Sequence, residues 1–265
     1  MSSALSILSQ GPVFAEPGIG DFFPPAFAFE GTIFEMNRMV LVRLIATFAL
    51  VAVFGIGAAR AKLVPGRGQS ILELLVIFVR DNVAIETLGE KQGRRFAPIL
   101  TTIFLAVLFL NMTGVIPGLN IAASSVVAVP LVFAILSYVI FIGAGIQAQG
   151  VGGFFKSQLF PPGVPWPIYI LLTPIELLST FVIRPATLTI RLLANMLAGH
   201  LMLALLFFGT HFLFFEATGA LKLVGGVTFV SALIFTLFEI FVAALQAFIF
   251  SILTAVYIKL SIETH

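Results

Sequence analysis

Long apolar segments separated by short polar ones dominate the pattern of this chain. The first runs over about residues 39–59, the second over about 96–116 and the third over about 125–146. A helix rises 1.5 Å per residue, so about 20 apolar residues cross the ~30 Å hydrocarbon layer of a bilayer. The pattern therefore predicts three membrane-spanning helices before residue 147.

Two further apolar segments, residues 168–209 and 221–260, are about twice as long as one crossing requires. Each could form a tight helical hairpin, or one long helix tilted well beyond the usual ~20°. The first contains Pro174 and Pro185, whereas the second has no proline and no glycine from Val227 onwards. A continuous helix is therefore expected in the second segment, and one crossing per segment gives five crossings in total.

The segment between the first two spans, residues 69–90, is of mixed character. Its apolar residues can share one face of a helix and its charged residues another. This predicts a helix that lies at the membrane interface. The apolar face would hold Ile71, Leu74, Leu75, Phe78 and Val79, and the charged face Glu73, Arg80 and Asp81.

Basic residues indicate the orientation of the spans. Residues 60–95 contain seven Lys or Arg, whereas the loop 117–124 contains none. Because cytoplasmic loops are rich in Lys and Arg, the 60–95 loop is expected in the cytoplasm, with the N-terminus outside and the C-terminus inside. The Gly/Pro-rich loop 148–167 is then also cytoplasmic. Residues 1–37 are expected to form an external N-terminal arm, and residues 38–265 a single transmembrane helical domain.

Composition supports an all-α polytopic membrane protein. The chain is 60% hydrophobic and 10% charged, whereas soluble domains average about 25% charged residues. A net charge of +2 gives a nucleic-acid partner no electrostatic support. The absence of cysteine excludes disulfides and thiolate chemistry. Residues 1–12 lack the basic and apolar regions of a signal peptide, which favours a bacterial plasma membrane over an organelle.

The stretch Arg191–His200 places an arginine, an asparagine and a histidine inside one of the long apolar segments. An arginine at the bilayer centre costs about 2.5–3.5 kcal/mol on insertion scales. A structural role would require an acidic partner within the chain, and the spacings leave neither Glu176 nor Glu239 beside Arg191 on its own face. The arginine is therefore expected to meet a charge elsewhere, with ions or protons as the first candidates.

The polar residues of the two long segments fall at helical spacings. Arg191 and Asn195 are four residues apart and share a face, whereas His200 lies on the opposite face. Glu239 and Gln246, seven apart, share a face of the last helix. Two packed helices could therefore present one zone with Arg191, Asn195 and Gln246, and a titratable zone with His200 and Glu239.

Purely structural explanations remain open for these groups. The asparagine and glutamine could link the helices by a hydrogen bond worth about 0.6 kcal/mol, and the histidine and glutamate could form a static buried pair. Glu176 could be a headgroup-level carboxylate, and Arg184 an interfacial side chain that extends to the headgroups. His211 and Glu216 are expected to be exposed at a short outer turn. No HExxH or GxSxG pattern supports metal or serine chemistry.

Several motifs in order resemble subunit a of F-type ATP synthases, the membrane stator component beside the c-ring. Arg191-Leu-x-x-Asn195-Met-x-Ala-Gly-His200 is similar to the core motif of that family. Leu245-Gln246-Ala-Phe-Ile-Phe250, followed by Leu253-Thr-x-Val-Tyr257, resembles its last-helix motif. The stretch 111–118 resembles its turn after the second span. The resemblance covers about residues 38–265 and is densest after residue 170.

The resemblance implies which residues translocate protons and how the two long segments fold. In the family the arginine is essential and separates two half-channels, a histidine and an acid form a pair of proton-path positions, and a glutamine faces the arginine. Glu176 is a looser match to an acid on the exit side. Both long segments would be strongly tilted helices. The implied proton-translocation residues are Arg191, Asn195, His200, Glu239, Gln246 and Glu176.

The implied function is proton translocation that protonates and deprotonates the c-ring carboxylates. The implied partners are the c-ring proteolipids, the peripheral-stalk b subunits and membrane lipid. The chain would not touch nucleotide, would not be an enzyme on its own, and would hold no cofactor or metal. Two rival functions remain: a self-contained secondary transporter in which Arg191 binds an anionic substrate, and an intramembrane hydrolase built around His200.

Overall fold

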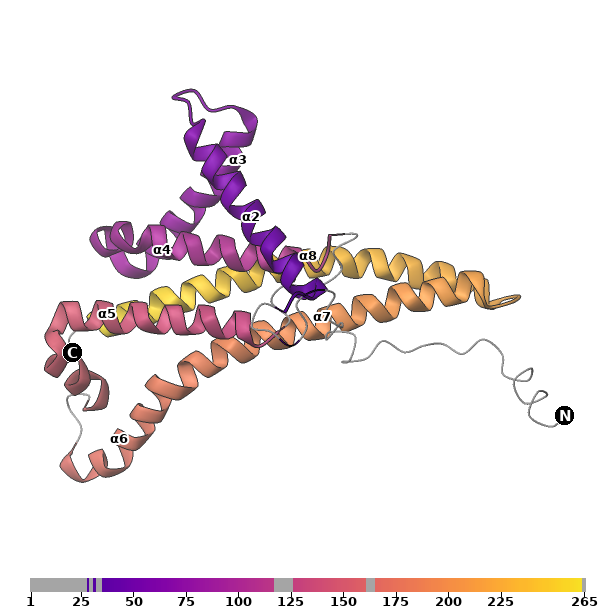
Figure 1. Ribbon diagram of the computed structural model, residues 1–265. Helices are drawn as coiled ribbons and strands as arrows, with labels where there is room; N and C mark the ends of the chain where they lie inside the picture. Colours follow the sequence, from indigo (N-terminus) through magenta and orange to yellow (C-terminus); the bar gives the residue numbers. More distant parts are fainter. Residues whose placement is uncertain (1–27, 29–30, 32–34, 117–125, 161–164, 264–265) are drawn as a thin grey trace.

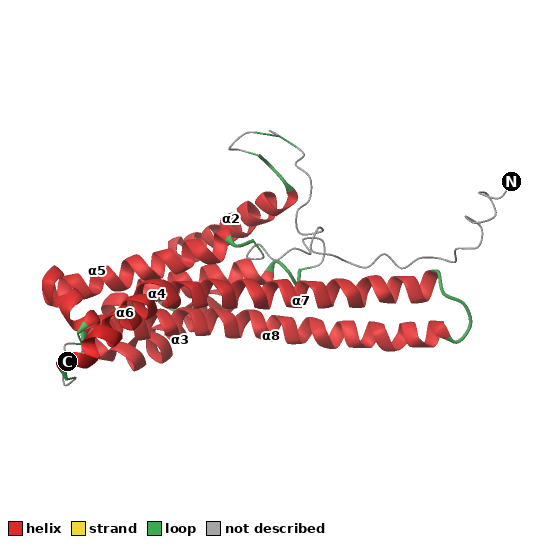
Figure 2. Ribbon diagram, turned by 90° about the horizontal axis from the view of Figure 1, so that it is seen from below, coloured by secondary structure: helices red, strands yellow, loops and turns green. Residues whose placement is uncertain are grey.

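The structure is a computed structural model that describes residues 28, 31, 35–116, 126–160 and 165–263. Every named element in this part of the chain is a helix (Figures 1 and 2). Most of the predicted external arm, residues 1–37, and the predicted loop 117–124 lie outside the described residues. In chain order the elements are α2 (Arg38–Ala59), α3 (Arg67–Val79), the π-helical η2 (Arg80–Ile85), α4 (Glu86–Met112), α5 (Ala128–Leu159), the 3₁₀ turn η3 (Trp166–Ile168), α6 (Tyr169–Leu178), the π-helical η4 (Ser179–Ile183), α7 (Arg184–Phe215) and α8 (Leu221–Ile262).

Five helical runs are long and apolar enough to cross a membrane. This confirms the predicted all-α polytopic fold with five candidate spans. The runs are Arg38–Ala59, Arg67–Met112, Ala128–Leu159, Tyr169–Phe215 and Leu221–Ile262.

Both of the unusually long segments are continuous helical runs, 47 residues over Tyr169–Phe215 and 42 residues over Leu221–Ile262. Prolines do not end the first run. An interior proline clashes with the carbonyl four residues earlier, which for Pro185 is that of Phe181. The π-helical turn η4 contains Phe181 and widens the helix at that point. The hairpin alternative for the two segments is therefore wrong.

The α7 and α8 helices run side by side and extend well beyond the other helices (Figures 1 and 2). A short turn joins them, and Gly219 in that turn has a φ of 63°, a left-handed conformation that glycine adopts without strain. Helix α8 also contacts α4 and α5. It therefore joins the bundle at one end and forms the projecting pair with α7 at the other.

Two glycines with positive φ make the helix boundaries differ from the predicted ones. Gly150 has φ 74° and bends α5, which then continues to Leu159. The predicted loop 148–167 is therefore wrong over residues 148–159. Gly89 has φ 76° and separates the start of α4 from its apolar part. A bend needs only one residue that tolerates positive φ, and the flanking residues stay helical.

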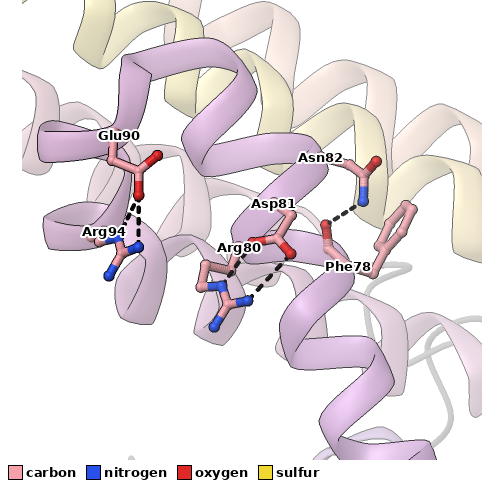
Figure 3. Close-up of polar contacts among 6 residues, drawn as sticks. All are labelled: Phe78, Arg80, Asp81, Asn82, Glu90 and Arg94. Carbon is pink, nitrogen blue, oxygen red and sulfur yellow. Dashed lines mark hydrogen bonds and ion pairs between the residues drawn. The ribbon is translucent and has the colours of Figure 1, made fainter.

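The mixed segment before the second span is helical, as its pattern predicts, but its predicted apolar face is only partly buried. Val79 is buried and Leu75 half-buried, whereas Ile71, Leu74 and Phe78 are exposed. Val79, Val83 and Ala84 are fully buried against the bundle. On its exposed side Arg80 Nε lies 2.7 Å from Asp81 Oδ1, and nearby on α4 Arg94 pairs with Glu90 at 2.6 Å (Figure 3). Whether this helix lies at the membrane interface stays a prediction.

Side chains of α5 hold the C-terminal end of α8. The last carbonyls of a helix lack partners within that helix, and here Gln149 Nε2 donates to Ser261 O at 3.0 Å. Ser261 Oγ in turn donates to Phe141 O at 2.6 Å. Gly145 permits this approach, since a Cβ at that position would collide with Ser261 Oγ and the Phe154 ring. The end of α8 is thereby fixed to the bundle.

Candidate functional site

The polar side chains of α7 and α8 meet where the two helices pack against each other. Asn195 Nδ2 donates a hydrogen bond to Gln246 Oε1 at 2.9 Å. Gln246 is only 2% exposed, so this bond satisfies a buried amide. The structure thus brings together two residues that helical spacing placed in one zone. This bond also fixes the register of α7 against α8 one turn from Arg191.

Glu239 is the buried carboxylate of this interface, at 6% exposure. It fits because Gly199 lies opposite it: a Cβ on Gly199 would collide with both carboxylate oxygens. His200 is the next residue of α7 and is half-buried. The structure therefore places Glu239 against the α7 turn that carries His200, as the predicted titratable zone requires.

Arg191 differs from Asn195 and Gln246, which bond to each other across the α7–α8 interface. It is exposed, and within the part of the chain that the structure describes it makes no hydrogen bond and no ion pair. Ala194 and Ala198 are exposed on the neighbouring positions of the same face. The guanidinium is therefore presented on a surface of small side chains, which allows another helix to approach closely.

Glu176 and Arg184 lie on the N-terminal side of Arg191 along the same helical run. Glu176 on α6 is half-buried and has no ion pair within 4 Å among the described residues. Arg184 packs its guanidinium over the Tyr257 ring of α8, 5.4 Å from the ring centre. This cation–π contact holds the Arg184 side chain on the protein, and its expected position at the headgroups stays a prediction.

Two buried polar atoms next to this contact lack partners among the described residues. Thr180 Oγ1 and Arg184 Nη1 are both buried, and no described residue hydrogen-bonds to either. Thr180 is fully buried in the π-helical turn η4. Sequence reasoning missed Thr180 and gave Tyr257 only as part of the last-helix motif, because only the packing of α8 on the α6–α7 run reveals their surroundings. For Thr180 the available signal was its position in an apolar segment shortly before Pro185.

The remaining candidates lie at the outer end of the projecting α7–α8 pair, near the turn that joins the two helices. His211 and Glu216 are both exposed, as expected, and the His211 ring packs on Phe215 at 4.8 Å between ring centres. Thr210 Oγ1 donates to Thr228 Oγ1 at 3.0 Å and links the two helices there. Over the described ranges no cluster of three His, Cys, Asp or Glu residues has a geometry that could hold a metal ion.

Comparison with known proteins gives consistent matches over almost the whole chain. The family model described as ATP synthase A chain matches residues 40–259. The ATP synthase subunit a of Rhodococcus erythropolis is 44% identical over 250 residues, which cover 94% of this chain and 91% of that protein. The subunit a of Frankia alni is 39% identical over 84% of this chain and 76% of its own length. That of Streptomyces lividans is 33% identical over 97% and 90%.

The contact between Gly199 and Glu239 generates a prediction about stability. Gly199→Ala should lower the free energy of unfolding by about 1–3 kcal/mol, because the added methyl overpacks the α7–α8 interface. Gly209→Ala on the same helix is the matched control, since nothing lies within 4 Å of its added Cβ. Thermal unfolding in detergent measures both.

A second substitution checks the cause of that loss. Combining Gly199→Ala with Glu239→Asp, which shortens the acid by one methylene, should recover part of the lost stability. Equal melting temperatures for the Gly199 and Gly209 variants would contradict the close approach seen at this contact.

Proposed function

The chain belongs to the ATP synthase A chain family, and from that premise we propose how its residues move protons. As a member of this family it is the proton-translocating stator subunit of an F-type ATP synthase, a multi-pass membrane component of that complex. The secondary transporter and the intramembrane hydrolase are therefore not favoured. The observation that carries the proposal is the absence of any partner for Arg191 among the described residues.

The partner of Arg191 is a carboxylate on a c-ring proteolipid. A cation within the hydrocarbon layer needs a compensating negative charge, and the described residues supply none. The small exposed side chains of Ala194 and Ala198 leave room for the outer helix of such a ring. The hydrogen bond between Asn195 and Gln246 holds α7 and α8 in register, so the guanidinium keeps its position as the ring turns.

The entry half-channel delivers protons through His200 and Glu239. A proton from outside reaches these titratable side chains and passes to a c-ring carboxylate. Burial disfavours the charged form of a carboxylate, so only the neutral carboxylic acid moves readily into lipid. The buried position of Glu239 beside the His200 turn supports this assignment.

The exit half-channel begins at Arg191 and leads toward Glu176. The guanidinium does not deprotonate in proteins, so it stabilises the ionised carboxylate that arrives and favours release of its proton. The same fixed charge repels protons and prevents direct leakage between the half-channels. Buried polar atoms without protein partners are sites for water, and those of Thr180 and Arg184 lie on the stretch between Glu176 and Arg191.

Coupling to ATP synthesis occurs outside this subunit. A membrane potential of 100 mV supplies about 2.3 kcal/mol per proton, and ring rotation transmits that energy to the catalytic part of the complex. The chain itself does not bind nucleotide and is not catalytic on its own. Its further partners are the peripheral-stalk b subunits, which hold it against the ring.

The basic residues set the orientation. The N-terminus and the arm of residues 1–37 lie outside, the single transmembrane domain spans residues 38–265, and the C-terminus lies in the cytoplasm. The membrane is the plasma membrane of a bacterium.

Removing the cation tests the role of Arg191. Arg191→Ala should abolish ATP-driven proton pumping in inverted membrane vesicles, because ring carboxylates would meet no positive charge. ATP hydrolysis and the subunit composition of the purified complex serve as controls for assembly. Near-normal pumping by a fully assembled variant would refute the assigned role.

Substitutions at the entry half-channel should have graded effects. Glu239→Gln and His200→Ala should each slow proton transport and change its dependence on pH, because each removes a titratable group from the path. His211→Ala is the matched control, since this exposed histidine on the same helix lies at the outer end of the hairpin. Pumping rates measured across a pH series check this. Unchanged profiles for both entry variants would count against a proton path there.

A further inference from the structure

A small pocket opens where α4, α5 and the C-terminal end of α8 meet, far along the chain from the proton-path residues. Its cavity volume is about 170 Å³. Gln92, Arg95 and Gln147 line its polar side, and Phe96, Ala148 and Ile262 are among its apolar lining residues. Figure 1 shows the start of α4 and the end of α8 at the same end of the bundle. Three helices therefore line one pocket, which has a polar side and an apolar side.

Arg95 supplies the positive charge of this pocket. Its Nη2 donates to Gln147 Oε1 at 2.5 Å, and its guanidinium lies over the Phe96 ring at 5.5 Å. No carboxylate among the described residues pairs with it. The adjacent Arg94 differs, because Glu90 neutralises it at 2.6 Å (Figure 3). The charge on Arg95 is thus balanced only by an uncharged amide.

The acidic groups near the pocket have other partners. Glu263, just after the end of α8, lies 3.8 Å from Lys259. The last carbonyls of α8, which carry the negative end of the helix dipole, accept hydrogen bonds from Gln149 and Gln158. Lys91 is exposed one turn before Arg95. Among the described residues, the local electrostatic balance is therefore positive and favours an anion.

The position of the pocket along α4 indicates what kind of anion it accepts. Arg95 immediately precedes Phe96, where the apolar part of α4 begins, so the pocket is expected where this helix passes from the headgroup region into hydrocarbon. A polar mouth above an apolar floor fits the junction between a lipid headgroup and its acyl chains. Basic pockets between transmembrane helices bind anionic headgroups in this way, and the arginine fork matches phosphate oxygens.

We propose that this pocket binds the phosphate headgroup of an anionic phospholipid. Arg95 contacts the phosphate oxygens, and the amide groups of Gln92 and Gln147 donate further hydrogen bonds. The glycerol end of the lipid lies against Phe96, Ala148 and Ile262. A lipid in this position ties α4, α5 and α8 together on the side where α8 ends, and it does so independently of the proton path.

Photo-crosslinking tests this proposal on the purified synthase complex. The probe is photoactivatable phosphatidylglycerol, and labelling is read from peptides that contain residues 91–96 and 144–148. Arg95→Gln should reduce the labelling on the order of tenfold, since it removes the charge-assisted contact. Arg94→Gln makes the same change one residue away at a neutralised arginine and should leave labelling unchanged.

Three further arms decide between the sources of the anion. Equal labelling by photoactivatable phosphatidylcholine would overturn the proposal, because that headgroup carries no net charge. Displacement of the probe by inorganic phosphate would identify a site for free phosphate and also overturn it. Equal loss of labelling in the two arginine variants would do the same. The Arg191→Ala complex should keep full labelling, which separates this proposal from the proton-translocation mechanism.

Discussion

A positive charge with no counter-charge among the described residues of its own chain is the constraint on which this structure depends. A guanidinium placed in hydrocarbon requires a counter-charge, and Arg191 has none among the described residues of the chain. Asn195, one turn from Arg191 on α7, bonds to Gln246 of α8 instead. In the proposed function, the carboxylates of a rotating ring supply the missing counter-charge in succession.

The architecture serves to hold that charge still. Long helices are needed because the polar zones are spread along α7 and α8. Both helices are longer than one membrane thickness requires. Close contacts at glycines then fix their positions: Gly199 admits the Glu239 carboxylate, and Gly145 admits the end of α8. Since interiors are packed to near-crystalline density, each contact resists sliding of α8. One contact in the middle of α8 and one at its C-terminal end thus fix the helix that packs against α7.

The sequence predicted the five long helices and the pairing of polar positions, because both follow from periodicity and length. The Asn195–Gln246 contact is an example, since the spacings group polar positions on one face of each helix, and packing of those faces brings the two side chains together. The bends at Gly89 and Gly150 could not be predicted, because a glycine within a helical pattern is compatible with either a straight or a bent helix. The packing of Arg184 on Tyr257 depends on which helices touch, and a local pattern does not contain that information. The unpaired state of Arg191 required the structure as well.

Cysteine cross-linking within the assembled complex measures the meeting of Arg191 with the ring most directly. Ala194 lies on the exposed face beside Arg191, whereas Leu192 is fully buried within the subunit. A cysteine at position 194 should form a disulfide with a cysteine placed one turn from the c-subunit carboxylate, and a cysteine at position 192 should not. Failure of position 194 to cross-link, or equal cross-linking at both positions, would contradict the account.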